Sequence, residues 1–115
     1  MKTKIFCDSA DFKTIKKLNN NPLVAGFTTN PSLMRLAGAK NYKNYSLKLL
    51  SVCKKKPISL EVFGDSFDQM LRQAMIINSW GKNVYVKIPV VNSKGLFSGK
   101  VIKILSQKDI KLNIT

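Results

Sequence analysis

The chain has 115 residues, and its 20 Lys and Arg against 6 Asp and Glu give it a net charge of +14. Its length and its 44% hydrophobic content suit one small domain with a buried core, which excludes an intrinsically disordered protein. No apolar run reaches the roughly 18–20 residues of a membrane-spanning helix, so we predict no membrane partner.

Strand and helix alternate along the whole chain. In chain order the predicted elements are a strand over residues 4–8, a helix over 11–19, a strand over 24–29, a short helix over 31–37, a helix over 42–53, a strand over 57–63, a helix over 67–80, a strand over 83–89, a helix over 94–107 and a strand over 111–115. Apolar spacings of three and four residues predict the helices. Asn30 before Pro31 predicts a capped helix start, and Gly38 and Gly81 predict helix ends.

This alternation predicts an α/β fold with parallel strands and right-handed crossovers. No glycine-rich phosphate-binding motif follows a strand, which argues against a nucleotide-binding sheet. Four strand-helix units fill nearly the whole chain, so eight would need roughly 200–220 residues, the size of a small (β/α)8 barrel. We therefore predict that residues 1–115 form a single partial TIM-barrel domain, about the first half of such a barrel. Its open edge strands would be prone to pair with other chains.

The amino terminus and the cysteines predict a cytoplasmic protein. The first residues lead directly into a strand, without the apolar core and cleavage site of a signal peptide. Two cysteines, at positions 7 and 53, are too few for a disulfide framework.

The positive charge raises the question of nucleic acid. The cations are almost all lysines spread over several predicted helices, the one run at residues 54–56 is short, and no basic-aromatic alternation occurs. We expect no nucleic-acid partner and keep a basic nucleic-acid-binding module as a distant alternative, which would show steep salt dependence. The charge could still attract phosphorylated substrates.

Lys87 lies within the apolar run VYVKIP, which is typical of a strand buried on both faces. Burying an ammonium group is costly, but a desolvated lysine amine can form a Schiff base with a carbonyl compound. A lysine at a strand end that reaches solvent is the commoner arrangement, so Lys87 alone does not decide the chemistry.

Polar residues recur where each predicted strand ends. In a parallel barrel these positions meet at the carboxyl-terminal mouth, where active sites lie. Together they supply one amine, two carboxylates and small hydrogen-bonding groups, although each has a structural alternative such as helix capping. They are Asp8, Asn30, Glu61, Lys87, Asn113 and Thr115.

Five segments at these strand ends resemble the transaldolase family, and most closely the short bacterial and phage transaldolases akin to fructose-6-phosphate aldolase. The combination of TTNPS and VKIP is the most specific part. The segments are FCDSAD at 6–11, GFTTNPS at 26–32, ISLEV at 58–62, VYVKIP at 84–89 and LNIT at 112–115.

The resemblance implies a (β/α)8 barrel and class I aldol chemistry without a metal or organic cofactor. It implies that Lys87 forms the Schiff base, that Asp8 is the general base and that Glu61 transfers protons through a water molecule. Asn30 and Asn113 would bind the hydroxyl groups of a dihydroxyacetone unit, and Thr115 would support Glu61 or its water molecule. Ketose and aldose phosphates are the implied substrates, the pentose phosphate pathway the implied setting, and a homo-oligomer the implied assembly of the full-length family.

A glutamate at position 61 favours a transaldolase over the aldolase branch, which tends to carry a glutamine. The family's phosphate-binding serine and arginine belong to later strands, so we expect a truncated or partial transaldolase. The alternatives are an inactive half-barrel remnant or self-associating fragment, and a fructose-6-phosphate aldolase acting as a lyase.

Overall fold

The computed structural model describes residues 3–115 and contains one sheet of five parallel strands with helices between them. In chain order the elements are β1 (Ile5–Asp8), α1 (Phe12–Leu18), β2 (Val24–Thr28), α2 (Pro31–Leu36), α3 (Tyr42–Val52), β3 (Ile58–Glu61), α4 (Phe67–Asn78), β4 (Val84–Ile88), α5 (Gly99–Gln107) and β5 (Leu112–Ile114). Met1 and Lys2, part of the segment expected to lack a signal peptide, lie outside the described residues. Within residues 3–115 no helix is both long enough and apolar enough to cross a membrane.

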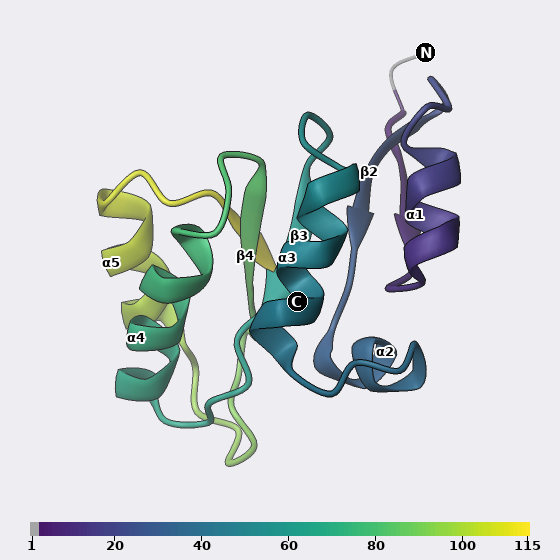
Figure 1. Cartoon of the computed structure of the whole chain (residues 1–115). Helices are drawn as coiled ribbons and strands as arrows, with labels where there is room; N and C mark the ends of the chain where they lie inside the picture. Colours follow the sequence, from purple (N-terminus) through teal and green to yellow (C-terminus); the bar gives the residue numbers. More distant parts are fainter. Residues whose placement is uncertain (1–2) are drawn as a thin grey trace.

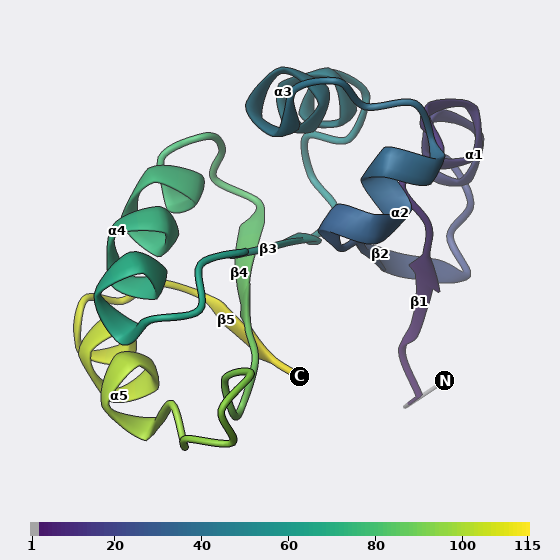
Figure 2. The same cartoon turned by 90° about the horizontal axis from the view of Figure 1, so that it is seen from below.

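The strands follow the chain in the order β1-β2-β3-β4-β5, each parallel to the next. The helices cover one side of the sheet, and the sheet curves away from them (Figure 1). In the view from below, the strands form an arc whose open side lies between β1 and β5 (Figure 2). This is the half-barrel that the alternation of strands and helices predicts.

The hydrophobic core lies between the convex side of the sheet and the helices. Along β4 the apolar Val84, Val86 and Ile88 are buried, whereas Tyr85 and Lys87 between them are half-buried. The alternation arises because successive side chains of a strand point to opposite faces. The expectation that both faces of this strand are buried is therefore met only on the helix side.

A side-chain cap begins each of the helices α1 to α4. The Asn30 side-chain oxygen Oδ1 accepts a hydrogen bond from the Leu33 amide at 2.8 Å, and this cap begins α2. Asp11 caps α1, because its carboxylate accepts a hydrogen bond from the Thr14 amide at 3.0 Å. Such caps satisfy amide groups that have no partner in the first helical turn.

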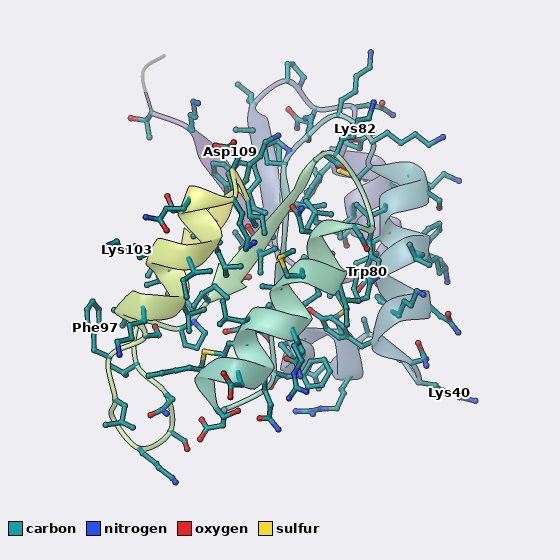
Figure 3. All side chains as sticks on the ribbon, turned by 90° about the vertical axis from the view of Figure 1, so that its left-hand side faces the viewer. Lys40, Trp80, Lys82, Phe97, Lys103 and Asp109 are labelled. Atoms are coloured by element: carbon teal, nitrogen blue, oxygen red, sulfur yellow. The ribbon has the colours of Figure 1, made fainter. Side chains whose placement is uncertain are left out.

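The predicted helix over 94–107 begins five residues later, at Gly99. The Asn92 side-chain carbonyl accepts hydrogen bonds from the Lys94 and Leu96 amides, both at 3.0 Å, and so turns the backbone away from a helix. A bridge pairs Val91 with Phe97, and Phe97 projects from this loop with 68% of its surface exposed (Figure 3). The apolar spacing continues through the loop, but the hydrogen bonds of the Asn92 side chain hold residues 92–96 in a turn and prevent a helix there.

Candidate active site

Three of the predicted site residues are direct neighbours across the sheet. Glu61 on β3 is the Cα partner of Lys87 on β4, and Lys87 is the partner of Asn113 on β5. The parallel register thus aligns a carboxylate, an amine and an amide at the carboxyl ends of adjacent strands. All three are half-buried, so each is partly shielded and still accessible.

Asp8 lies in a neighbouring row of the sheet. It is paired with Thr28, which is paired with Ser59, two residues before Glu61 on β3. The Thr28 hydroxyl donates a hydrogen bond to the Asp8 carboxylate at 2.9 Å. Asp8 itself is exposed, and two strands separate it from the strand of Lys87. It can therefore meet a molecule bound at Lys87 only across the concave side of the sheet.

The Lys87 amine is weakly held. Its Nζ donates to the Thr29 carbonyl at 3.4 Å, near the long limit for a hydrogen bond. Thr29 is fully buried, and its own hydroxyl donates to the Ser59 carbonyl at 2.7 Å, so the accepting carbonyl is fixed in place. A lysine with one long contact to a rigid carbonyl can turn toward a bound carbonyl group at little cost.

Glu61 is the carboxylate whose charge interacts with Lys87. Burial raises the pKa of Glu61 above its ordinary value, and the positive charge of Lys87 lowers it part of the way back. The Tyr42 hydroxyl donates to the Glu61 backbone carbonyl at 2.8 Å, and burial raises the pKa of Tyr42, which keeps this donor protonated. Glu61 therefore has a backbone held by Tyr42 and a carboxyl group whose protonated form burial favours.

The amide side chains differ in what they already bind. The Asn113 amide nitrogen donates to the Ser59 hydroxyl at 3.0 Å, which orients Asn113 beside Lys87. Asn30 uses its oxygen for the helix cap, so its NH₂ group is the part suited to a ligand. Thr115 is exposed and is paired through its backbone, with its amide donating to Ile88 at 3.0 Å. The predicted support of Glu61 by Thr115 stays a prediction.

Sequence reasoning missed the residues that hold these groups in place, namely Thr28, Thr29, Tyr42 and Ser59. A signal for two of them was present: Thr28 stands two residues before Asn30 and Ser59 two residues before Glu61, the spacing of side chains on one strand face. For Tyr42 no such spacing exists, because it comes from the helix α3.

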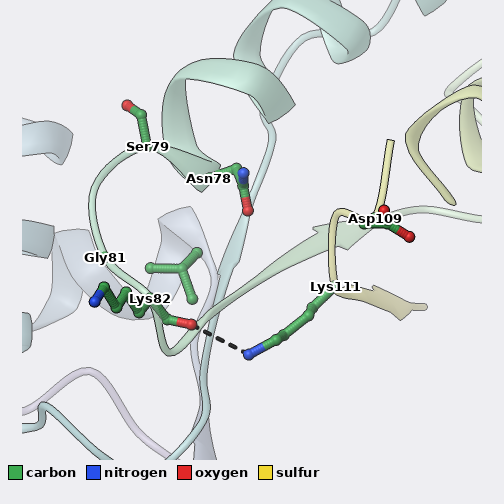
Figure 4. Close-up of a pocket in the computed structure, with 7 residues that line it drawn as sticks. Asn78, Ser79, Gly81, Lys82, Asp109 and Lys111 are labelled. Carbon is green, nitrogen blue, oxygen red and sulfur yellow. Dashed lines mark hydrogen bonds between the residues drawn. The ribbon is translucent and has the colours of Figure 1, made fainter. Parts of the chain in front are cut away.

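An open hollow of about 550 Å³ lies on the concave side, lined by Lys4, Phe6, Thr28, Pro57, Ser59, Tyr85, Leu112, Asn113 and Ile114. Among the predicted site residues, Asn113 lines this hollow, whereas Asp8, Glu61 and Lys87 do not. A second hollow of about 400 Å³ lies at the opposite end of β4, where Lys111 donates to the Lys82 carbonyl at 3.2 Å (Figure 4). None of the predicted site residues lines this second hollow, which is at the end of a parallel barrel where active sites do not form.

An amine paired with a carboxylate and an amide at the carboxyl ends of adjacent strands, with a further carboxylate on β1, is suited to Schiff-base chemistry on a hydroxylated carbonyl compound. The family model for transaldolase/fructose-6-phosphate aldolase matches residues 5–115. The chain belongs to this family.

Curated transaldolase relatives align with nearly all of the chain. A probable transaldolase of Herpetosiphon aurantiacus is 36% identical over 112 residues, which are 97% of this chain and 48% of the relative. One of Clostridium kluyveri is 36% identical, with 97% and 49% covered. One of Streptococcus equi subsp. zooepidemicus is 36% identical over 114 residues, with 97% and 50% covered. The chain thus spans about half the length of these relatives, consistent with an amino-terminal portion of the transaldolase/fructose-6-phosphate aldolase family.

In this family member, a Lys87→Met substitution is expected to raise the pKa of Glu61 further, because the only effect lowering it comes from the Lys87 charge. Titration of the Glu61 carboxyl carbon by NMR measures the shift. A Lys82→Met variant, changed at the far end of β4, is expected to leave the pKa of Glu61 as in the parent chain. An unchanged or lower pKa of Glu61 in Lys87→Met would show that the two side chains do not interact.

The raised pKa of Glu61 also makes stability depend on pH. Folding favours the protonated carboxyl group, so the free energy of unfolding falls as pH rises from the ordinary pKa of glutamate through the raised pKa of Glu61. Glu61→Gln is expected to remove this component. Urea unfolding over that pH range tests it, and a Gln variant with the same pH dependence as the parent chain would contradict it.

Proposed function

We propose that this chain carries the Schiff-base part of a transaldolase, which moves a dihydroxyacetone unit from a ketose phosphate to an aldose phosphate. The observation that supports it best is the pairing of Lys87 with Glu61 and Asn113 at the carboxyl ends of adjacent strands. In this proposal residues 1–115 act as one partial barrel domain. The cytoplasmic location, the homo-oligomeric assembly and the lack of a nucleic-acid partner belong to the same proposal.

The reaction begins at the Lys87 amine. Nζ attacks the ketone carbon of the donor and forms a carbinolamine, and Glu61 passes protons through a water molecule as water leaves and the iminium ion forms. Asp8 then removes the proton of the hydroxyl group next to the carbon–carbon bond that breaks. The aldehyde leaves, and the electron pair of that bond moves into the iminium group to give an enamine.

The retained three-carbon unit stays bound to Lys87. Asn30 and Asn113 donate hydrogen bonds to its hydroxyl groups, and Thr115 supports Glu61 or its water molecule. The enamine carbon then attacks the aldehyde of the acceptor, Asp8 returns its proton to the new hydroxyl group, and water releases the product from Lys87. In this proposed cycle every proton taken up is returned, and no step requires a metal ion or an organic cofactor.

Reduction with borohydride in the presence of fructose 6-phosphate tests the proposal. A three-carbon adduct on Lys87, located by peptide mass mapping, is expected. Lys111→Met removes a lysine at the other end of the sheet and should keep the adduct, whereas Lys87→Met should lose it. A folded sample without an adduct, or with the adduct on another lysine, would contradict the assignment of Lys87.

Fructose-6-phosphate aldolase is the second candidate, because the matching family model includes both activities. The two differ in the fate of the enamine, which a transaldolase passes to an acceptor aldehyde and an aldolase protonates to free dihydroxyacetone. Product analysis with and without an acceptor separates them. The inactive-remnant alternative predicts no adduct on Lys87 at all.

A further inference from the structure

A third hollow, of about 260 Å³, lies beside α2, and we call it the α2 hollow. α2 and the start of α3 lie together at the end of the sheet toward which the strands run (Figure 1). The α2 hollow is lined by two cations, Arg35 and Lys40, and by the apolar or aromatic side chains of Pro31, Met34, Ala39, Tyr42 and Phe63. The proposed reaction at Lys87 uses none of these side chains.

The aromatic wall of the α2 hollow is held in place. The Tyr42 hydroxyl donates to the Glu61 carbonyl at 2.8 Å, and the Tyr42 ring lies 6.1 Å from the ring of Trp80. The Phe63 ring meets the Tyr42 ring edge to face, with centroids 5.5 Å apart, yet it remains 62% exposed. Met34 beneath is buried. The hollow therefore offers a preformed apolar surface with an aromatic ring open to a ligand.

The turn after α2 brings the two cations to the same hollow. The Gly38 amide donates to the Arg35 carbonyl at 3.0 Å, and the Ala39 amide donates to the Met34 carbonyl at 3.0 Å. With Gly38 at φ +95°, this is the turn that commonly ends a helix and fixes the path of the chain after it. The Lys40 side chain then extends from the turn into solvent (Figure 3).

Both cations are available to an anion. The Arg35 guanidinium makes one long hydrogen bond, to the Ser32 hydroxyl at 3.4 Å, and both Arg35 and Lys40 are exposed. No Asp or Glu within residues 3–115 lines the α2 hollow. The chain around it is also strongly basic, because residues 12–60 contain ten Lys and Arg without any Asp or Glu. The field at this hollow therefore attracts a negatively charged ligand.

We propose that the α2 hollow binds a compact aromatic anion, such as an aryl phosphate. Its ring would lie against Phe63 and Tyr42, and its charged group would accept hydrogen bonds from Arg35 and Lys40. A cavity of about 150 Å³ accepts benzene, so the α2 hollow has room for one ring and one charged group. The inference goes beyond the proposed function, whose sugar phosphates carry no aromatic ring.

Titration of the 115-residue chain with phenyl phosphate, followed by amide NMR, tests the inference. Phenyl phosphate is expected to bind at least about tenfold more tightly than inorganic phosphate or benzyl alcohol, because each of these lacks one of the two contacts. The shifts should centre on the amides of Ala39, Tyr42 and Phe63. Equal affinity for phenyl phosphate and inorganic phosphate, or shifts centred on the lysines of α1, would overturn the inference.

Two arginine variants test the charge contact. Arg35→Gln is expected to weaken phenyl phosphate binding about tenfold. Arg72→Gln changes the other arginine of the chain, which is exposed on α4 and does not line the hollow, and should bind as the parent chain does. Equal binding by these two variants would overturn the inference.

Two phenylalanine variants test the ring contact. Phe63→Ala should weaken binding of phenyl phosphate and leave that of inorganic phosphate unchanged. Phe97→Ala, at a ring that is 68% exposed and does not line the hollow, should change neither. Because Phe63 is itself mostly exposed, its loss should leave the fold intact, which circular dichroism checks. Phenyl phosphate binding by Phe63→Ala at the parent affinity would overturn the inference.

Binding at the α2 hollow and chemistry at Lys87 can fail separately. Lys87→Met should bind phenyl phosphate as the parent chain does, because Lys87 does not line the α2 hollow. Weaker binding by Lys87→Met would place the anion at Lys87 and overturn the inference. A borohydride adduct on Lys87 in a chain that does not bind phenyl phosphate contradicts only this inference. Binding without any adduct contradicts only the proposed function.

Discussion

With Asp8→Asn, borohydride and fructose 6-phosphate are expected to leave a six-carbon adduct on Lys87 in place of the three-carbon adduct. In the proposed mechanism the iminium ion forms with Lys87 and Glu61, which this substitution does not change. Cleavage of the carbon–carbon bond needs a base for the neighbouring hydroxyl proton, and an amide cannot accept it. A positioned general base contributes about 10²–10⁴-fold to such a step, so cleavage should slow by a similar factor while the six-carbon adduct accumulates.

The local structure at position 8 should survive the substitution. The Thr28 hydroxyl donates to the Asp8 carboxylate at 2.9 Å, and an asparagine offers a carbonyl oxygen at the same place. Asp11→Asn is the matched control, because Asp11 lies three residues further on and caps α1 through a bond that asparagine can also accept. It should keep the three-carbon adduct. A three-carbon adduct formed at the parent rate by Asp8→Asn would remove Asp8 from the mechanism.

The sequence predicts every strand and helix of this fold because their signals are local. Asn30 with Pro31 marks the start of α2 correctly, and the apolar run around Lys87 marks β4. The failure at 94–98 has a specific cause, since the side chain of Asn92 binds two amide groups that a helix would have used. Apolar spacing alone does not reveal such a bond.

The site was predictable as a set of residues but not as an arrangement. The rule that polar residues gather at the carboxyl ends of parallel strands selects Glu61, Lys87 and Asn113, which are Cα partners. The offset of Asp8 could not be predicted, because the register between strands is fixed by packing across the sheet and not within one strand. The period of two along a strand predicts which of its side chains share a face. Which residues of neighbouring strands lie side by side is known only from the folded structure.

The contacts of Lys56 also could not be predicted from the sequence. The run at residues 54–56 is consistent with three solvated lysines, yet only Lys54 and Lys55 are exposed. The Lys56 ammonium donates to the carbonyl groups of Leu18 at 3.4 Å, Asn21 at 2.5 Å and Val24 at 2.6 Å. It thereby links the segment before β3 to the turn between α1 and β2, a contact between residues more than 30 positions apart.

Lys56→Met is therefore expected to lower the free energy of unfolding by about 2–4 kcal/mol, because hydrogen bonds to a charged group contribute about 1.5–3 kcal/mol each and several carbonyl groups lose their donor together. Methionine preserves the apolar stem, so the loss reports the ammonium group and not packing. Lys55→Met, one position earlier and exposed, should change stability by less than about 0.5 kcal/mol. Urea unfolding followed by circular dichroism measures both variants. Equal stabilities would mean that water replaces the ammonium group at the three carbonyls, and that the turn between α1 and β2 is held by its own backbone bonds alone.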